Sequence, residues 1–375
     1  MLTNNFDIRV FSSTGQLSAD WPDADDRTGA AFFVFQSKSF LKAWETTYGQ
    51  KPGVQLCLTE VRQSDGTPLL FLPLSVTRIY GSRVLSFIDD GVSDYNAPIV
   101  FPAAAKLSHE TAALILNAVI AAVPSHDVIA LCKMPERIEG SANHLWLVTN
   151  LPSGASAHAI SLTRPLDEIE RSIRSIGNLK KHDRALRRME GYQFFIAQNA
   201  DERQLVLNVM LRQKQRRFEE TMVPGFDAHP EKRRFFEAAT KELAQRDALH
   251  LSALKVGETI LATMWSIVRK GHYCAMITTF ENGDWGRFSP GKLLMLRLLS
   301  ELKAQDYTCF DLGYGDEPWK TELCDQTTFL RDYIRPLTLR GRISLILAHA
   351  LERMRATPFY KKLRPLKWRL LRKFR

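Results

Sequence analysis

Cysteine is scarce in this chain, and so are long apolar runs and signals for export. The 375 residues include five cysteines, none spaced as Cys-x-x-Cys, which argues against a disulfide framework or a zinc site and fits reduced thiols. The longest nearly apolar runs, residues 112–123 and 343–351, are too short to cross a bilayer. The start of the chain lacks the charged and apolar regions of a signal peptide. We therefore expect a cytoplasmic protein without a metal or a membrane span, peripheral at most to the inner face of the membrane.

Acidic residues are nearly absent from the end of the chain. Residues 340–375 contain twelve Lys and Arg and a single acid, Glu352, so this basic tail accounts for the whole net charge of +10. Apolar residues recur in the tail at helical spacing, although Pro358 and Pro365 would break or kink a helix. This composition suits an interfacial helix on an anionic membrane, and it suits docking on an acidic protein or on the protein's own surface equally well. The recurring apolar residues are Phe359, Leu363, Leu366, Leu370 and Phe374.

The composition, with 45% hydrophobic and 25% charged residues, is that of a soluble globular protein, and the length suggests two domains. Residues 1–30 have few periodic apolar positions, so we expect an extended or loosely packed lead-in. The clearest hairpin in the first half turns at Asp65-Gly66. Residues 150–156 read as a junction between halves. The elements expected before this junction are a helix at 32–48, strands at 54–61, 69–77 and 83–88, a helix at 106–123 and a strand at 127–133.

The second half repeats this order of strands, helix and strand after a more helical start. Three β-rich runs joined by tight turns predict an antiparallel meander, and a helix and a returning strand follow it. The repetition hints at an internal duplication of fold. The expected elements are strand 158–162, helix 165–190, strand 192–198, helices 201–218 and 229–246, strands 249–256, 259–269 and 272–280, a helix from 290 to 306, and strands 307–312 and 329–339.

Seven Lys and Arg lie between residues 171 and 188, within one predicted helix. Lys180, Arg184 and Arg188 share a face of that helix because they are four residues apart. Such a stripe is either a solvated face or a surface for phosphate or nucleic acid, and the spacing leaves both open.

The stretch 285–320 changes its apolar period twice, and polar residues gather at both change points. Pro290 can occupy the first turn of the predicted helix. The backbone N–H groups of Gly291, Lys292 and Leu293 would then lie at a helix N-terminus, where they and the helix dipole favour an anion such as a pyrophosphate. The alternative is that these residues simply begin a helix.

Two other groups of residues suggest chemistry as well as structure. Asp89, Asp90, Asp94 and Tyr95 crowd into one loop, where neighbouring carboxylates raise one another's pKa or meet a cationic substrate, unless the loop is merely solvated. An aromatic stripe at Phe40, Trp44 and Tyr48 is typical of a core face. Cys309 and Cys324 are possible acyl carriers, but we expect nothing beside them to supply a His, which favours core thiols.

The layout of the chain resembles the CelD-like acetyltransferases, GNAT-fold proteins associated with the synthesis of bacterial cellulose and other polysaccharides, and distantly akin to the FemAB peptidyl transferases. The resemblance spans residues 40–339. It is carried by Ser289-Pro290-Gly291-Lys292-Leu293-Leu294, by Phe310-Asp311-Leu312-Gly313 and by Lys320, and it touches Trp44, Tyr48, Asp94 and Tyr95.

The resemblance implies an α+β protein with two tandem GNAT-like domains, each a mixed, mostly antiparallel sheet flanked by helices. The N-terminal domain would span residues 31–155 and the C-terminal domain, which holds the acyl-CoA site, residues 156–339. A lead-in segment at 1–30 and the basic amphipathic tail at 340–375 complete the expected organisation.

Membership would also place acetyl-CoA or another acyl-CoA, as co-substrate and without a metal, between strand 272–280 and the following helix. The residues implied for this contact are Arg287, Ser289, Gly291, Lys292 and Leu293. The sequence departs from the usual GNAT loop, Gln/Arg-x-x-Gly-x-Gly/Ala, because Gly291 follows Arg287 by four residues and no second Gly is present.

Direct attack of an amine or hydroxyl on a thioester requires a base, an oxyanion donor and an acid for the leaving thiolate. Asp311 is the candidate to act as base or to position the amine, unless turn amides satisfy its carboxylate, and Glu317 is its substitute. Tyr314 is the candidate acid, and Lys320 would hold an acidic group of the cofactor or acceptor. The candidate substrate-binding residues are Trp44, Tyr48, Asp94, Tyr95, Arg216 and Lys320.

The expected function is therefore a GNAT-type acyltransferase, most simply an N-acetyltransferase, acting in polysaccharide or cell-envelope biosynthesis. One alternative is an aminoacyl-tRNA-dependent transferase like the FemAB proteins, for which the basic helix would bind the tRNA. Another is a fold without catalysis, a scaffold held by its basic tail at the membrane face of a polysaccharide synthase.

Overall fold

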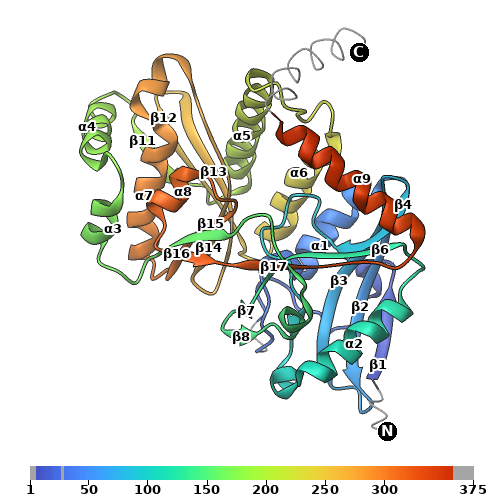
Figure 1. The fold of residues 1–375 in the computed structure, drawn as a ribbon. Helices are drawn as coiled ribbons and strands as arrows, with labels where there is room; N and C mark the ends of the chain where they lie inside the picture. Colours follow the sequence, from blue (N-terminus) through green and yellow to red (C-terminus); the bar gives the residue numbers. More distant parts are fainter. Residues whose placement is uncertain (1–5, 27–28, 358–375) are drawn as a thin grey trace.

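Two large β-sheets with helices packed against them make up the fold, which confirms the expected α+β class (Figure 1). The computed structural model describes residues 6–26 and 29–357. None of the helices within this part of the chain is both long and apolar enough to cross a membrane. The apolar stripe predicted from Phe359 to Phe374 lies outside the described residues.

The first sheet runs in the order β1-β2-β3-β4-β6-β17-β9, and the short β5 pairs with β3. Its neighbours are antiparallel except for β4 and β6, which are parallel. Its strands are β1 (Phe6–Phe11), β2 (Gln55–Gln63), β3 (Pro68–Ile79), β4 (Ser82–Phe87), β5 (Ile99–Val100), β6 (Val128–Pro135), β9 (Leu151–Pro152) and β17 (Leu330–Pro336).

The second sheet runs in the order β11-β12-β13-β14-β15-β10-β16, and its single parallel pair is β14 with β15. The predicted meander is confirmed as β12, β13 and β14. The strands are β11 (Gln193–Ile196), β12 (Leu249–Val256), β13 (Thr259–Arg269), β14 (His272–Phe280), β15 (Cys309–Tyr314), β10 (Ala157–Ser161) and β16 (Gln326–Thr328). A small ribbon of β7 (Arg137–Ile138) and β8 (Ser141–Ala142) stands apart.

The two sheets share one motif: an antiparallel meander is followed by a helix and then by a strand that lies parallel to the last meander strand. In the first sheet the motif is β2-β3-β4, α2 and β6, and in the second it is β12-β13-β14, α7 and β15. The predicted repetition of fold is therefore visible in the topology.

The two halves also exchange strands. β17, late in the chain, pairs with β6 of the first sheet, and β10, which follows the junction, lies between β15 and β16 of the second. The predicted final strand at 329–339 exists as β17, and it lies between β6 and β9 of the first sheet. The domain boundaries at 155 and 339 stay a prediction.

The helices divide between two sides of the second sheet. α3, α4 and α7 pack with one face in a core that includes Ile169, Leu186 and Leu298, and α5 and α6 cover the other. The helices are α1 (Lys38–Glu45), α2 (His109–Ala122), α3 (Leu166–Ser172), α4 (Ile176–Arg187), α5 (Ala200–Glu220), α6 (Pro230–Ala244), α7 (Pro290–Ala304), α8 (Pro318–Leu323) and α9 (Leu339–Ala356). Short 3₁₀ turns are η1 (Thr14–Gln16), η2 (Val34–Gln36), η3 (Tyr48–Gln50), η4 (Pro102–Lys106), η5 (His144–Val148) and η6 (Gly283–Phe288).

One core cluster joins the halves. Phe40 of α1 meets Phe235 of α6 edge to face, with ring centroids 5.3 Å apart, and both rings are fully buried. Burial of aromatic area on this scale is a main source of stability. The two sheets are therefore held in one arrangement by packing as well as by the exchanged strands.

Two local expectations are wrong. The lead-in at 1–30 is not loosely packed in its described part, since β1 pairs with β2 and Trp21 is buried, stacked 5.3 Å from Phe71. The helix predicted at 165–190 is two helices, because Ser175 adopts the left-handed conformation (φ 64°), which an α-helix cannot continue through.

Candidate active site

The strands β14 and β15 pair only at their beginnings and then separate. Three residue pairs join them, ending with Cys274 and Asp311. Beyond this point a bulge at Met276 disturbs the pairing of β14 with β13, since Ile277 pairs with Trp265 and Ala275 with Ser266. The side of β14 that faces β15 has no strand partner after Cys274 among the described residues, so its backbone groups there are available to a ligand.

A cavity of about 500 Å³ opens where the strands separate, a volume within the ordinary range for small-molecule sites. β14 contributes Thr278 and Phe280, and β15 contributes Leu312. The floor is apolar and the rim is polar, so the cavity suits a ligand with an apolar part and a charged part. The remaining lining residues are Ile173, Arg174, Met264, Asn282, Gly286, Ser289, Pro290, Gly291, Lys292, Met295, Trp319, Glu322 and Leu323.

The N-terminus of α7 forms one wall of this cavity. The prediction that three backbone amides are free there is wrong for two of them, because the N–H groups of Lys292 and Leu293 donate to the Ser289 carbonyl oxygen at 3.0 and 3.1 Å. Ser289, in the left-handed conformation (φ 55°), turns its carbonyl toward them. The Gly291 N–H is the one of the three with no partner in the described residues.

The side chains of this segment divide between wall and core. Lys292 is exposed and lines the cavity, whereas Leu293 is buried in the core of the second sheet. Arg287 is exposed and lies over the Phe288 ring, 4.9 Å from its centroid, and does not line the cavity. An anion at this wall would therefore meet one free amide, the helix dipole and the Lys292 ammonium.

Asp311 lies on β15 next to the cavity-lining Leu312 but belongs to a buried polar cluster. Its Oδ2 accepts hydrogen bonds from the Tyr95 hydroxyl at 2.6 Å and from His272 Nε2 at 2.9 Å, and its Oδ1 accepts one from the Gly313 N–H at 2.7 Å. Its side chain is 2% exposed. Three donors already occupy the carboxylate that sequence reasoning assigned as the base.

Both side chains that bond Asp311 have shifted pKa values. Burial and the adjacent Asp311 charge raise the pKa of Tyr95 well above its usual value, so its hydroxyl stays a donor. Burial alone would lower the pKa of His272, but Cys274 and the bond to Asp311 raise it well above its usual value. The raised pKa of His272 favours its protonated form beside Asp311. Tyr95, from the other half of the molecule, completes the cluster.

Strand pairing also brings thiols to this cluster. His272 is opposite Cys309 and Cys274 is opposite Asp311, so all four side chains share one face of the two strands. The expectation that no His lies beside Cys309 is wrong, because the parallel pairing joins residues far apart in sequence. Burial raises the pKa of Cys274 to about 11, which keeps this thiol protonated and unreactive.

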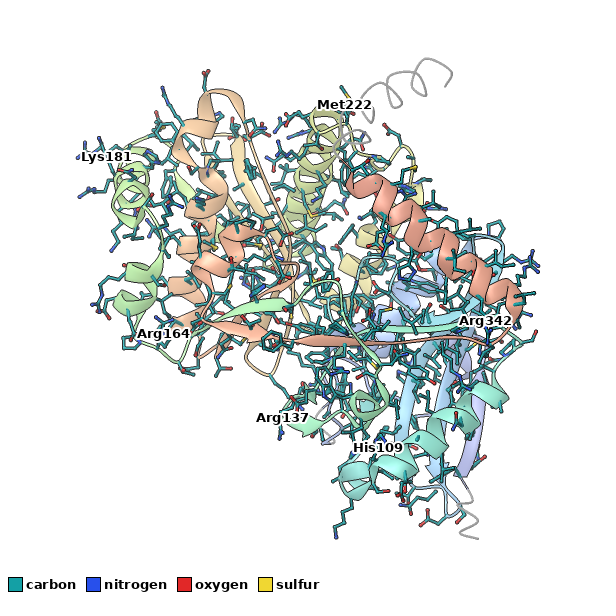
Figure 2. All side chains as sticks on the ribbon, viewed as in Figure 1. His109, Arg137, Arg164, Lys181, Met222 and Arg342 are labelled. Carbon is teal, nitrogen blue, oxygen red and sulfur yellow. The ribbon has the colours of Figure 1, made fainter. Side chains whose placement is uncertain are left out.

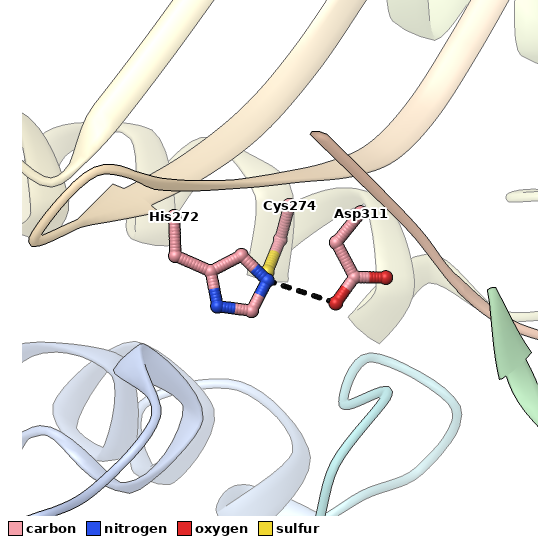
Figure 3. Close-up of side chains that lie close together, drawn as sticks. All are labelled: His272, Cys274 and Asp311. Atoms are coloured by element: carbon pink, nitrogen blue, oxygen red, sulfur yellow. Dashed lines mark hydrogen bonds and ion pairs between the residues drawn. The ribbon is translucent and has the colours of Figure 1, made fainter. Parts of the chain in front are cut away.

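His272, Cys274 and Asp311 offer three metal-ligand atoms within 4.8 Å of one another (Figure 3). Imidazole, thiolate and carboxylate are all zinc ligands. In this geometry, however, the imidazole donates to the carboxylate directly, and the Tyr95 hydroxyl bonds the same oxygen. A cation would have to break both bonds, so the cluster fits a hydrogen-bonded network better than a metal centre.

Asp94 lies against the end of β15, on the backbone of Gly313. Gly313 has φ 71°, and a Cβ at this position would fall 2.2 Å from Asp94 Oδ2, so glycine is required both by conformation and by space. Burial, with a further contribution from the Asp311 charge, raises the pKa of Asp94 to about 7, against the opposing effects of Lys133 and Lys320. This partly buried carboxyl can therefore gain or lose a proton near neutral pH.

The other predicted catalytic residues lie close by. Tyr314, whose pKa burial raises, has its ring 5.0 Å from Lys133 Nζ. Lys320 is buried and donates to the Tyr314 carbonyl oxygen at 2.9 Å, while its ion pair with the exposed Glu317 spans 3.1 Å. Lys320 thus fastens α8 to the end of β15, and Glu317 faces solvent.

The remaining predicted substrate residues do not line the cavity. Trp44 and Tyr48 are buried in the aromatic core beside Phe235, and neither lines the cavity. Arg216 of α5 is bound to Glu281 at 2.6 Å and to the carbonyl oxygen of Phe280, a cavity residue. Arg216 therefore contacts a cavity residue but does not line the cavity itself.

Comparison with known proteins fits this geometry. Residues 173–321 match the sequence family described as Acetyltransferase (GNAT) domain. The second half of the chain is therefore similar to a GNAT domain. That match contains β14, α7 and most of α8, the elements that form the cavity. No curated protein sequence matches the chain significantly.

Solved structures extend the similarity to both halves. A structure of FemX has 12% identity and a TM-score of 0.58, with 84% of this chain and 95% of that chain covered. At this identity the similarity establishes the fold alone. Lower TM-scores, 0.48 and 0.44, are found for the structure of L-PGS from Bacillus licheniformis (12% identity, 88% and 98% covered) and for a tandem GNAT protein from the clavulanic acid biosynthesis pathway (10% identity, 88% and 98% covered).

Proposed function

We propose that this protein transfers an acyl group from acyl-CoA to an amine or hydroxyl, as a CelD-like enzyme of polysaccharide or cell-envelope biosynthesis. The observation that carries the proposal is the cavity between the separated strands β14 and β15, beside the N-terminus of α7. The GNAT match of residues 173–321 supports an acyl donor and an acceptor as the two substrates.

The two parts of the cavity suit the two parts of an acyl-CoA. Met264, Met295 and Leu312 on the apolar floor would hold the acyl chain and the adjoining arm. The free Gly291 N–H and the Lys292 ammonium at the rim would bind a phosphate group. Backbone N–H groups of β14 beyond Cys274, where no strand among the described residues pairs with it on the β15 side, are the donors available to the oxyanion of the transition state.

In the proposed reaction, the acceptor nitrogen attacks the thioester carbon, the carbon–sulfur bond breaks, and CoA leaves as a thiolate that takes up a proton. We assign Asp94 as the base that removes the proton of the acceptor, because a base works best with a pKa near the working pH. Asp311 would be a positioning residue that holds Tyr95 and His272, and Tyr314 would supply the proton to the thiolate. Glu317 and Lys320 would position α8 at the cavity.

Thermal unfolding with CoA, acetyl-CoA and longer acyl-CoAs tests the proposal. Saturation at about 100 times the dissociation constant stabilises a folded protein by roughly 2.7 kcal/mol, which raises the unfolding temperature by a few degrees. A rise that depends on acyl chain length would support the donor and narrow its identity. No rise at millimolar CoA would contradict it.

The exposed side of α4 favours a second candidate, transfer from an aminoacyl-tRNA, which the resemblance to FemAB proteins implies. Lys181, Arg184 and Arg188 are exposed there and form no ion pair among the described residues, and Lys181 points outward in Figure 2. Lys180, in contrast, is paired with Glu170. A turnover that requires RNA and falls in Arg184→Glu would favour this candidate over the first.

A further inference from the structure

The last helix presents an apolar face to solvent. The positions Leu339, Ile343, Ile346, Leu347, Ala350 and Met354 follow one another at steps of four, three, one, three and four, so they form one stripe along α9. Five of these side chains are large and remain well exposed, from 46% for Met354 to 74% for Leu339. Single exposed apolar residues are ordinary, but a continuous stripe on one helix marks an interaction surface.

The opposite side of α9 is fixed to the body of the protein. A Cβ on Gly341 would lie 2.2 Å from the Asp127 carbonyl oxygen, so the helix sits directly on that backbone. Thr338 caps the helix at the Gly341 N–H and also donates to Asp127, and Ser344 is buried. The docked side therefore cannot rotate outward without losing these contacts, and the exposed apolar stripe is held facing solvent. Figure 1 shows α9 on the outside of the ribbon.

Basic residues border the stripe. Arg342 and Arg353 lie along one of its edges by helical position, and neither forms an ion pair within the described part of the chain. Glu352, the single acid of the helix, falls on the docked side. The sequence that follows the helix, residues 358–375, adds eight Lys and Arg, four aromatic residues and no acid.

From these observations we infer that α9 is a membrane-docking helix, which binds an anionic lipid surface through its outward stripe. An apolar stripe about 100° wide with basic borders is the pattern of a helix that lies in the plane of a bilayer interface. The stripe enters the acyl region while the flanking arginines meet lipid phosphates.

An acidic protein and the chain's own last residues are the competing occupants. The last residues carry the same positive charge as the borders of the stripe, so folding back would bring like charges together. An acidic protein could pair with the arginines, but it would also need a groove that fits a straight stripe with four large aliphatic side chains. A bilayer binds such a stripe without a matching groove. The charge and the shape therefore favour lipid.

The experiment is co-sedimentation of the full chain with vesicles of phosphatidylcholine alone and of phosphatidylcholine with phosphatidylglycerol. The test variant is Ile343→Asp with Ile346→Asp, and its matched control is Leu114→Asp, which changes an equally exposed apolar residue on α2. We expect binding to the anionic vesicles only, weakened at least about tenfold in the test variant and by high salt but unchanged in the control. All three proteins should unfold at the same temperature, because the altered side chains are exposed.

Three results would overturn the inference. The first is that the unaltered protein does not bind anionic vesicles. The second is that the test variant and Leu114→Asp bind equally well. The third is that the protein is a dimer without vesicles and becomes a monomer in the test variant, which would assign the stripe to a second copy of the chain. The double variant Arg342→Glu with Arg353→Glu is an independent test, since it should weaken vesicle binding about tenfold while leaving the apolar stripe intact.

Discussion

At the scale of single residues, the two carboxylates at the end of β15 have different environments and therefore different capacities. Asp311 is buried and accepts three hydrogen bonds, whereas Asp94 has a pKa raised to about 7. When two neighbouring carboxyl groups have different environments, their pKa values differ, and one can act as acid or base where the other cannot. Our assignment of Asp94 as base follows from this contrast.

Asp94→Asn should lower turnover by about 100-fold or more, because general-base catalysis contributes that much. In the unaltered enzyme, kcat/KM should rise with pH through about 7 as Asp94 loses its proton, and this rise should be absent from the residual activity of the variant. pH–rate profiles of both proteins make the measurement. A variant that retains the same rise would assign the titration to another group.

Asp94 should also make the free energy of unfolding depend on pH. Its pKa is higher in the folded state, about 7, than its ordinary value of 3.8, so the folded protein binds the proton more tightly. The contribution of this group to the free energy of unfolding is therefore full below about pH 4 and declines as the pH rises to 7. Urea unfolding across this window should show a smaller decline in Asp94→Asn. An identical slope in both proteins would contradict the raised pKa.

Gly313→Ala should destabilise the fold and reduce activity, because the residue has φ 71° and its Cβ would clash with Asp94. Gly66→Ala is the control, since Gly66 has φ 88° but open space around it, and should cost only the conformational strain of about 1–2 kcal/mol. The excess loss in Gly313→Ala measures the close contact with Asp94. Equal losses would show that the carboxylate can move away freely.

At the scale of elements, the separation of β14 from β15 creates the cavity, and the periodic parts of this region could be predicted from the sequence. The strand 272–280 and the helix that begins at Pro290 match β14 and α7, because strong alternation and leucine repeats fix both. The break of the helix at Ser175 was missed, because the left-handed residue is a serine and the nearby Gly177 lies inside α4.

The site itself was predictable only in part. Asp311, Tyr95 and Asp94 stood out by motif and crowding, but their contact depends on how the two halves pack, which no local pattern states. His272 and Cys274 were missed for the same reason. The polar residues of His-Tyr-Cys and Cys-Phe-Asp face one another only because β14 and β15 are parallel neighbours, and the sequence does not state that pairing. The occupied amides of Lys292 and Leu293 depend on the left-handed Ser289, which sequence does not reveal.

Lys292→Glu should weaken CoA binding about tenfold, because reversing the charge removes an attraction to phosphate and adds a repulsion. Lys106→Glu is the matched control, an exposed lysine of η4 that does not line the cavity. Titration calorimetry with CoA compares the two. Equal affinity in both variants would mean that the phosphates bind elsewhere.

At the scale of the whole molecule, the exchange of strands couples the halves. β17 completes the first sheet after the chain has already built the second, and Tyr95 of the first half bonds Asp311 of the second. The full chain should therefore unfold in a single transition, with tryptophan fluorescence and circular dichroism giving coincident curves. Two well-separated transitions would show that each half folds independently.

The central claim is that the cavity between β14 and β15 binds the acyl donor, and filling the cavity tests it most directly. Thr278→Trp places a large side chain in the opening from an exposed position, and Thr259→Trp makes the same change on the exposed end of β13. Calorimetric titration with acetyl-CoA should show binding to the unaltered protein and to Thr259→Trp, weakened at least about tenfold in Thr278→Trp. Equal binding by both variants, or none by the unaltered protein, would contradict the account.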